Sequence, residues 1–384
     1  MSKAFRLPIY VFFLGILIFS SCQREEGLQQ DNNITDIAAL PETVTFPSNN
    51  PYSTAKFELG RTLFWDPILS GSKDVACATC HHPDLGYADG RDLSSGVNGI
   101  GLGSNRTNGD VVKRNAPTII NTAFNGIDID GNYNPNTAPM FWDNRVSGLE
   151  EQALLPILSK EEMRGETIAE ADIVNVVVER LNAMPTYRNL FATAFGSQTI
   201  NETQIVQALA TFQRNIVANN SPFDDYMRGD PNALNNQEIR GLNTFINSGC
   251  ANCHSGPMFS DYDLHTLSVP DHSLVDDSGA TGNFDFRTPS LRNLEFTAPY
   301  MHNGSFDDLR DVLDFYNDIS RRNGDSQNPN VGDNQIAQDA RDLQINREDI
   351  DDIITFLNTL NDENFDKFIP QSVPSGLSVG GNIN

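Results

Sequence analysis

The pentapeptide Cys77-Ala78-Thr79-Cys80-His81 is repeated in pattern by Cys250-Ala251-Asn252-Cys253-His254. In each CxxCH motif, two thiols three residues apart reach the two vinyl groups of one haem, and the next histidine lies under the iron as proximal ligand. A zinc site would need four ligands, and the motif supplies at most three. A thioredoxin-type CxxC belongs in a βαβ context, which the flanking sequence lacks. The sequence therefore predicts two covalently bound haems c, ligated by His81 and His254.

The spacing and periodicity around these motifs predict a mainly α-helical protein. The motifs begin 173 residues apart, which favours one haem per domain over a compact multihaem chain. Apolar residues recur at helical spacing in Glu202–Ala218 and Arg347–Leu360, and Gln237–Asn247 is expected to form a short helix before the second motif. Strand alternation is scarce. The Gly- and Asn-rich stretches Gly96–Gly109 and Arg321–Gly332 are expected to be surface loops.

Acidic residues dominate the charge of the chain. Asp and Glu number 51 against 26 Lys and Arg, so the formal net charge is −25. This balance argues against a nucleic-acid partner, because phosphate neutralisation needs Lys and Arg. The acidity either keeps the protein soluble or steers it toward a basic partner, and the sequence leaves both readings open. Hydrophobic residues make up 39%, which is enough for packed cores and excludes a wholly disordered chain.

The N-terminus predicts export. Residues 1–22 contain two basic residues, the apolar run Leu7–Phe19 and the terminal Ser20-Ser21-Cys22. This is a secretory signal peptide, and it is too short for a comfortable membrane span. Small residues before a cysteine resemble the lipobox of bacterial lipoproteins, so we expect Cys22 to be lipidated. The alternative is an ordinary signal peptide with an incidental cysteine.

These observations divide the chain into five parts. After the signal peptide, residues 23–50 are polar and aperiodic and are expected to form a flexible tether. We then expect an N-terminal haem domain at 51–225, a C-terminal haem domain at 226–370 and a tail at 371–384. The lipid would be the sole membrane contact of an exported protein, either facing the periplasm or attached to the outer membrane.

The histidines predict an open first haem. His82 follows the proximal ligand directly and cannot reach the opposite face, and no other histidine occurs before Tyr187. A haem with histidine on one side reacts with a small molecule when its other side is open, and carries electrons when a second side chain closes it. The first haem therefore has no local histidine to act as a sixth ligand.

Long segments outside the motifs carry a family resemblance. They are ELGRTLFWDPILSGSKDVACATCHHPDLGYADGR (58–91), RNAPTIINTAF (114–124), MFWDNRVSGLEEQALLPILSKEEM (140–163), SGCANCHSGPMFSD (248–261) and FRTPSLRNLEFTAPYMHNGSFDDLRDVLDFYN (286–317). From about Phe57 to Phe365, the chain resembles the bacterial dihaem cytochrome c peroxidase family, which includes MauG-type enzymes. The resemblance implies two cytochrome c-like domains with one haem each, a peroxide site at the first haem and an electron relay at the second.

The resemblance also implies roles for individual residues. Trp142 matches the tryptophan between the two haems, Gln152 and Glu162 match the polar residues of the peroxide site, and Pro156 matches the proline beside them. Heterolytic cleavage of peroxide needs a group that moves a proton from one oxygen to the other, and a carboxyl group in a mostly apolar pocket can do this. Without the resemblance to this family, Glu162 would be interpreted as a solvent-exposed acid before a helix.

Further matches concern metal and haem contacts. Asn115, Thr297 and Pro299 match positions that hold a calcium ion in this family, and oxygen ligands suit such a cation. His302 matches a histidine near the second haem. Arg292 and Arg287 are candidate partners of the haem propionates, because guanidinium groups pair well with carboxylates.

Two departures from the family pattern matter for function. Many members carry a histidine in the loop after the first CxxCH that closes the peroxide haem until its partner is reduced, and Pro83–Pro117 contains none. We therefore expect a first haem that needs no reductive activation. In the well-known peroxidases, a methionine ligates the second haem at the position of Tyr316. A tyrosine at this position resembles MauG-type enzymes, and an anionic oxygen ligand lowers the reduction potential of the haem. Met301 is the rival ligand, and Met258 lies too close to His254.

Three functions remain open at this stage. The first is a peroxidase that reduces hydrogen peroxide to water with electrons from a small cytochrome c or cupredoxin. The second is a MauG-type oxidase that uses peroxide to modify a partner protein, which the tyrosine and the open first haem favour. The third is a plain electron carrier, against which Glu162 and Gln152 argue. A homodimer is left open.

Overall fold

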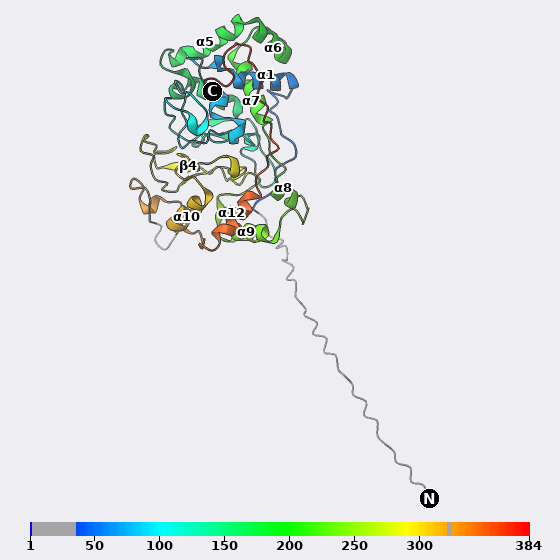
Figure 1. Cartoon of the computed structure of the whole chain (residues 1–384), viewed down its shortest axis with the longest axis vertical. Coiled ribbons are helices and arrows are strands. Elements are labelled where there is room, and N and C mark those ends of the chain that lie inside the picture. The colour runs from blue at the N-terminus through cyan, green and yellow to red at the C-terminus, as the bar shows by residue number, and fades with distance from the viewer. Residues whose placement is uncertain (2–35, 321–324) are drawn as a thin grey trace. The chain divides into compact units, whose positions relative to one another are not determined.

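The computed structural model describes Met1 and residues 36–320 and 325–384 (Figure 1). Cys22 and most of the expected signal peptide lie outside the described residues, so export and lipidation stay predictions. Everything from residue 36 onward belongs to one compact unit. Within the described residues, no helix combines the length and apolar composition that a membrane crossing requires.

Helices supply most of the regular structure in the described part of the chain, which confirms the expected mainly α class. The longer helices are α1 (Thr54–Trp65), α5 (Glu170–Ala183), α6 (Pro185–Phe195), α7 (Glu202–Arg214), α9 (Asn236–Asn247), α10 (Leu309–Ser320) and α12 (Ile350–Asn358). The short ones are α2 (Cys77–Cys80), α3 (Leu149–Gln152), α4 (Leu155–Leu158), α8 (Pro222–Met227) and α11 (Gln338–Arg341).

Two helix pairs have the same construction. Helix α1 packs against α7, and helix α9 packs against α12 (Figure 1). A Cβ atom at Gly60 of α1 would lie 2.0 Å from the carbonyl oxygen of Ala208 in α7. A Cβ atom at Gly241 of α9 would lie 2.0 Å from the carbonyl oxygen of Asp352 in α12. Each pair therefore needs a glycine at its crossing, because any side chain there would force the backbones apart.

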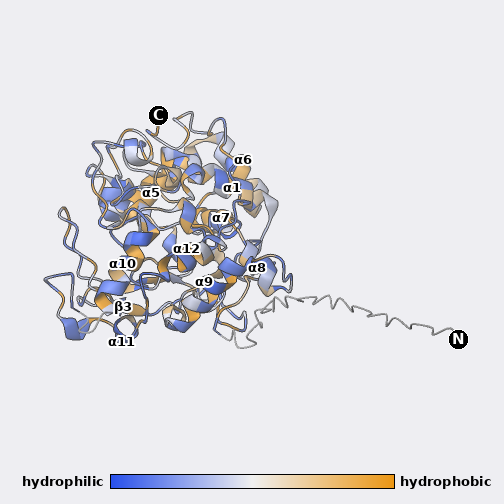
Figure 2. Cartoon of the chain, turned by 60° about the horizontal axis from the view of Figure 1, so that its bottom comes forward, coloured by the Kyte–Doolittle hydropathy of each residue, from blue (hydrophilic) through white to orange (hydrophobic). Residues whose placement is uncertain are grey.

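Local sequence explains where these helices form. Reciprocal side-chain and backbone hydrogen bonds cap α7 through Asn201 and Gln204, and cap α9 through Asn235 and Glu238. The predicted apolar face of α7 is fully buried, and single helices carry both hydrophobic and hydrophilic residues in Figure 2. The expected helix at Arg347–Leu360 is shorter than predicted at both ends. Apolar periodicity and caps are local signals, so the sequence predicts these elements closely.

Two short antiparallel hairpins complete the described fold. Strand β1 (Pro139–Met140) pairs with β2 (Val146–Ser147), and β3 (Leu264–Thr266) pairs with β4 (Asp285–Arg287). The register pairs Met140 with Val146, and His265 with Phe286. The turn of the first hairpin therefore presents the segment that contains Trp142.

The expected tether is wrong for residues 36–50. Ile37 and Leu40 are buried, with 1% and 2% of their surface exposed. The Leu40 N–H donates to the Asp224 carboxylate at 2.9 Å, and Ile37 pairs with Gly256 in a parallel bridge. Two isolated apolar residues with satisfied backbone groups suffice to fix this segment, although they form no periodic pattern.

The C-terminal tail packs on the first half of the chain. The Gly380 N–H donates to the Trp65 carbonyl at 2.8 Å, and the Thr79 hydroxyl donates to the Gly380 carbonyl at 2.7 Å. Gly381 pairs with Val75 in an antiparallel bridge. The chain therefore returns to the segment of the first CxxCH motif, and residues 371–384 complete that half rather than project from the second.

Candidate functional site

One cavity connects the two predicted haem-attachment motifs. Its volume is about 640 Å³, within the range of small-molecule and cofactor pockets. Its lining includes the two cysteines and the histidine of each motif, namely Cys77, Cys80, His81, Cys250, Cys253 and His254. The structure therefore brings together two motifs that lie far apart in sequence.

The two motif histidines are oriented in the same way. His81 Nδ1 lies 3.0 Å from the Tyr87 carbonyl oxygen, and His254 Nδ1 lies 2.9 Å from the Phe259 carbonyl oxygen. A carbonyl only accepts, so Nδ1 donates and Nε2 is left free to bind a metal. Burial lowers the pKa of both histidines, which favours the neutral, metal-binding form.

The cysteines fit covalent attachment of a haem in each half. All four are free thiols, and none is paired in a disulfide. Burial raises the pKa of Cys77 to about 12 and that of Cys250 to about 11, so these thiols stay protonated at neutral pH. Two buried thiols and a neutral, oriented imidazole at one cavity are the donor set that a c-type haem requires.

Glu162 lies on a turn that the backbone holds firmly. The turn spans Lys160–Arg164, and the Ser159 hydroxyl accepts a hydrogen bond from the Glu162 N–H at 3.3 Å. The Val97 N–H donates to the Glu161 carbonyl at 3.0 Å. Burial raises the pKa of the Glu162 carboxyl, while the positive charge of Arg145 opposes the shift.

The side chains of Glu162 and Gln152 both line the cavity, together with Pro156. The charge of Glu162 acts on the thiols of both Cys77 and Cys80, which places the carboxyl beside the first motif. The Oε1 atom of Gln152 is buried and has no hydrogen-bond partner among the described residues. A buried acceptor without a partner, on a residue that lines the cavity, leaves one hydrogen bond unmade at this point.

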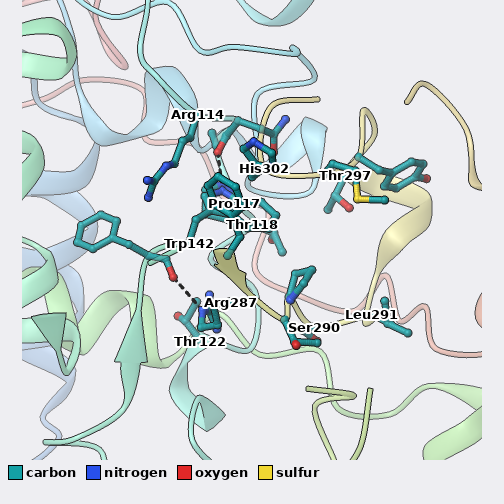
Figure 3. Close-up of a pocket in the computed structure, with 18 of the residues that line it drawn as sticks. Arg114, Pro117, Thr118, Thr122, Trp142, Arg287, Ser290, Leu291, Thr297 and His302 are labelled. Carbon is teal, nitrogen blue, oxygen red and sulfur yellow. Dashed lines mark hydrogen bonds between the residues drawn. The ribbon is translucent and has the colours of Figure 1, made fainter. Parts of the chain in front are cut away.

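Trp142 is held from both ends (Figure 3). Its indole Nε1–H donates to the Asn115 carbonyl at 3.0 Å, and its own carbonyl accepts from the Arg287 N–H at 2.7 Å. The Arg287 Nε–H donates to the Phe141 carbonyl at 2.8 Å. Trp142 lines the cavity that both motifs share, and its role as a relay stays a prediction.

The second motif meets a different set of side chains. Tyr316 and Met301, the two candidate ligands, both line the cavity and pack against the same apolar cluster. Burial raises the pKa of the Tyr316 phenol, and the thiols of Cys250 and Cys253 add to the shift. The phenol therefore lies beside the second motif.

His302 also lines the cavity, and its surroundings keep it neutral. Its ring stacks on the Phe286 ring with centroids 3.6 Å apart and planes at 13°. Burial lowers the pKa of His302 to about 4. The His302 carbonyl accepts from the Asn115 N–H at 2.8 Å, so this histidine is joined to the segment that holds Trp142.

The residues expected to hold calcium come together only in part. Asn115, Thr297 and Pro299 all line the cavity. The Asn115 Nδ2 donates to the Arg91 carbonyl at 2.7 Å and lies 3.4 Å from the Pro299 carbonyl. A cation needs oxygen at this point, so the set fits calcium only with the amide turned over.

Arg292 does not lie where the sequence places it. Its guanidinium is 2.8 Å from the Asp224 carboxylate and donates to the Pro257 carbonyl at 2.7 Å. It is 3% exposed and does not line the cavity, so its buried carboxylate partner replaces the expected propionate. Arg287, the other candidate, does line the cavity. Sequence cannot distinguish two arginines five residues apart when their partners are remote.

The loop after the first motif supplies no closing ligand. The cavity residues contributed by Pro83–Pro117 are Ser94, Val112, Lys113, Arg114, Asn115, Ala116 and Pro117. None of these is a histidine, cysteine or methionine, the side chains that commonly take an axial position on haem iron.

Sequence reasoning missed several charged residues at the cavity. Arg114 pairs with Asp143 and Asp277, and His265 pairs with Asp261. Cys253, Asp261 and His265 lie close enough for metal binding, but Cys253 belongs to the haem-attachment motif. Arg114 and Asp143 fall inside segments that carry the family resemblance, which was the one signal available.

Known proteins resemble this chain along most of its length. Residues 54–232 match the family described as di-haem cytochrome c peroxidase. The chain is 33% identical over 371 residues to methylamine utilization protein MauG of Methylorubrum extorquens, covering 93% of this chain and 94% of that protein. It is 30% identical over 334 residues to cytochrome c551 peroxidase of Nitrosomonas europaea, covering 85% of each. The crystal structure of a MauG-like protein associated with microbial copper homeostasis has a TM-score of 0.68, 29% identity, and coverage of 84% of this chain and 95% of its own.

Proposed function

Because the chain belongs to the di-haem cytochrome c peroxidase family, and is thus an oxidoreductase acting on peroxide, we propose that it reduces hydrogen peroxide to water at its first CxxCH motif. In this proposal the two halves are cytochrome c-like domains. His81 and the thioethers of Cys77 and Cys80 hold one haem c, and His254 with Cys250 and Cys253 holds the other. When bound, these haems supply the iron for O–O cleavage and the means to accept electrons one at a time.

The residues opposite the first motif handle the protons. Hydrogen peroxide takes up two protons and two electrons and leaves as two waters. The Glu162 carboxylate accepts a proton from one peroxide oxygen and returns it to the other, so that the second oxygen leaves as water. The buried Oε1 of Gln152, which lacks a protein partner, accepts a hydrogen bond from peroxide or water and orients it.

One observation carries this proposal. A half-buried carboxyl with a raised pKa, and an amide oxygen without a hydrogen-bond partner among the described residues, belong to residues that line the same cavity as an oriented, neutral histidine. An electron carrier has no use for Glu162 in such a place, because burying an acid without a strong partner costs stability. Electrons would arrive from a small cytochrome c or cupredoxin through the second haem and Trp142.

A second candidate function rests on Tyr316. A MauG-type enzyme uses peroxide to oxidise a partner protein, and a phenolate ligand at the second haem would favour high oxidation states. Tyr316 is partly buried beside the second motif, and MauG is among the relatives with high coverage. Both functions use the same peroxide site and differ in where the electrons come from.

The test is to add equimolar hydrogen peroxide to the fully ferric, haem-loaded protein and record its visible and near-infrared spectrum. We expect a fast spectral change without pre-reduction. A long-lived oxidised state shared by both haems would favour the MauG-type function, and rapid decay would favour the peroxidase. A protein that reacts only after reduction would show that a ligand closes the first haem, and the proposal of an open site would be wrong.

A further inference from the structure

Arg114 forms a buried ion triad in the wall of the cavity. Its guanidinium lies 2.7 Å from the Asp143 carboxylate and 2.5 Å from that of Asp277. The three side chains are 14%, 13% and 5% exposed, in the order Arg114, Asp143 and Asp277. A planar guanidinium can bridge two carboxylates in this way, whereas a lysine ammonium lacks the fixed fork.

The ion triad joins the same two chain segments as the hydrogen bond that holds Trp142. Arg114 precedes Asn115, whose carbonyl accepts the indole Nε1–H, and Asp143 follows Trp142. The two chain segments are therefore joined twice, once by the indole hydrogen bond and once by the ion pair between the neighbouring residues. In Figure 3, Arg114 lies above Trp142 and Arg287 lies below it.

The same guanidinium connects Trp142 to the second half of the chain. It lies 5.3 Å from the centroid of the Phe286 ring, and that ring stacks on His302. Asp277 belongs to the segment that precedes Phe286 in sequence. Arg114 therefore joins the segment that contains Trp142 to the wall beside His302 through its side chain, as Asn115 does through its backbone.

The charge balance shows that the triad is stably ionised. Burial disfavours the charged forms of Asp143 and Asp277, but the Arg114 guanidinium outweighs it, so the pKa of both carboxyls lies below the ordinary range. Lys113 and Arg145 lie at the two ends, 3.4 Å from Asp277 and 2.8 Å from Asp143. Removal of the central cation would leave two carboxylates facing each other in a poorly solvated place.

We propose that Arg114 is a positioning residue for Trp142, which fixes the indole between the two haem-attachment motifs through the Asp143–Arg114–Asp277 triad. This inference rests on the proposed function, because it assumes that electrons pass through Trp142. The triad includes none of the residues that the proposed function assigns to proton transfer or haem attachment, and the inference predicts a defect in electron transfer rather than in peroxide binding.

The experiment measures how fast the reduced second haem is oxidised after peroxide is added, by stopped-flow absorption of the haem-loaded protein. The variants are Arg114→Gln, Trp142→Phe and the double variant. Arg61→Gln is the matched control, because Arg61 is 13% exposed, pairs with Glu58 and Asp366, and lies 4.5 Å from the Phe57 ring, yet does not line the cavity. Haem content and thermal unfolding show whether each variant folds.

We expect Arg114→Gln to slow the oxidation of the second haem roughly 10- to 100-fold, because small misplacements of a reacting group have effects of this size. The kcat/KM for peroxide and the Arg61→Gln rate should stay within about twofold of wild type, because neither depends on the slowed electron-transfer step. In the Trp142→Phe background, Arg114→Gln should add less than about a twofold effect, because residues that act through one another are not additive.

Three results would overturn the inference in distinguishable ways. Arg114→Gln could slow oxidation of the second haem by the same factor in the Trp142→Phe background as in the wild-type background. Arg114 then does not act through Trp142, and the proposed function is unaffected. If Trp142→Phe is itself as fast as wild type, the relay role of Trp142 falls and the inference falls with it. Should Arg114→Gln fail to fold, Asp277→Asn replaces it and must show a smaller slowing, also absent in the Trp142→Phe background.

Discussion

The two halves of this molecule share a backbone frame, made of a glycine helix crossing and an oriented motif histidine. They differ in the side chains that face this frame. Each half has a helix crossing that only glycine permits, at Gly60 and at Gly241. Each has a motif histidine that donates Nδ1–H to a carbonyl five or six residues later. The residues that supply this carbonyl, Tyr87 and Phe259, have the same left-handed backbone, with φ of 55°.

The difference lies in the side chains that complete each site. The first motif faces Glu162 and Gln152, a half-buried acid and an amide whose Oε1 has no hydrogen-bond partner in the described part of the chain. The second motif faces Tyr316, which packs in an apolar cluster and contacts the Phe315 ring at 5.6 Å between centroids. In the proposed function, this common frame would hold the two haems, and the side chains that face it would suit one site to peroxide and the other to electron transfer.

The largest effect is expected from removing the acid that sets the first half apart. Glu162→Gln keeps the size and burial of the side chain but cannot accept a proton, so turnover of peroxide should fall roughly 10²- to 10⁴-fold. Steady-state kinetics with a reduced donor cytochrome measures this. Glu161→Gln is the control, because Glu161 is exposed and only its backbone carbonyl is used. Equal losses in both variants would remove Glu162 from the mechanism.

The pH dependence should identify the same carboxyl. Its active form is the carboxylate, and burial raises its pKa above the ordinary 4.5. The value of kcat/KM should therefore decline as the pH is lowered through a point above 4.5, with about a tenfold loss per pH unit below it. In Glu162→Gln, the residual activity should not show this acidic limb of the pH profile, that is, the decline of kcat/KM at low pH. A limb that persists in the variant would assign the titration to another group.

The second effect in size concerns the residue that faces the second motif. If Tyr316 ligates the second haem, Tyr316→Phe removes an anionic ligand, and the lower of the two midpoint potentials should rise by roughly 0.1 V or more. Potentiometric titration followed by visible absorption measures both haems. Met301→Leu is the control and should change neither potential. A shift in Met301→Leu instead would make the methionine the ligand and the second half an ordinary peroxidase relay.

The smallest effect tests the shared frame itself. Alanine is favoured over glycine in a helix by about 1 kcal/mol, but its Cβ would overlap a backbone oxygen at either crossing. Overpacking costs roughly 1–3 kcal/mol, so after the gain in helix propensity Gly60→Ala and Gly241→Ala should each lower the free energy of unfolding by up to about 2 kcal/mol. Thermal or chemical unfolding measures this, with Gly332→Ala as the control at an exposed turn where only side-chain ends lie near.

Hydrogen exchange then shows whether the two crossings are independent. Gly60→Ala should increase amide exchange in α1 and α7, and Gly241→Ala should do so in α9 and α12. Faster exchange in both pairs from either variant would mean that the two halves unfold as one cooperative body, and the comparison between them would hold for geometry but not for stability.

The sequence anticipates the elements whose signals are local. The caps of α7 and α9 and the apolar face of α7 lie within single segments, so these helices are predicted closely. The segment 36–50 was expected to be a tether because it lacks periodicity. Ile37 and Leu40 are nevertheless buried, and the segment hydrogen-bonds to Asp224 and Gly256, more than 180 positions away. Propensity carries no information about such contacts.

The residues of the candidate site show the same difference between local sequence signals and contacts with remote residues. Glu162 and Trp142 were identified through segments shared with a family, and the structure places both at the cavity. Arg292 was expected at a propionate, but its guanidinium pairs with Asp224 instead. Arg114 was not singled out, because one of its carboxylate partners lies 163 residues further along the chain.

The sequence by itself determined that this chain attaches two haems, because the covalent chemistry requires two thiols and a histidine within five residues. It also predicts His81 and His254 as the proximal ligands. Only the tertiary structure decided that both motifs share one cavity and that the C-terminal tail completes the first half. It alone showed which arginine faces the cavity. The physical reason is that bond lengths set a five-residue motif, whereas the direction in which a remote side chain points is set by packing across the whole fold.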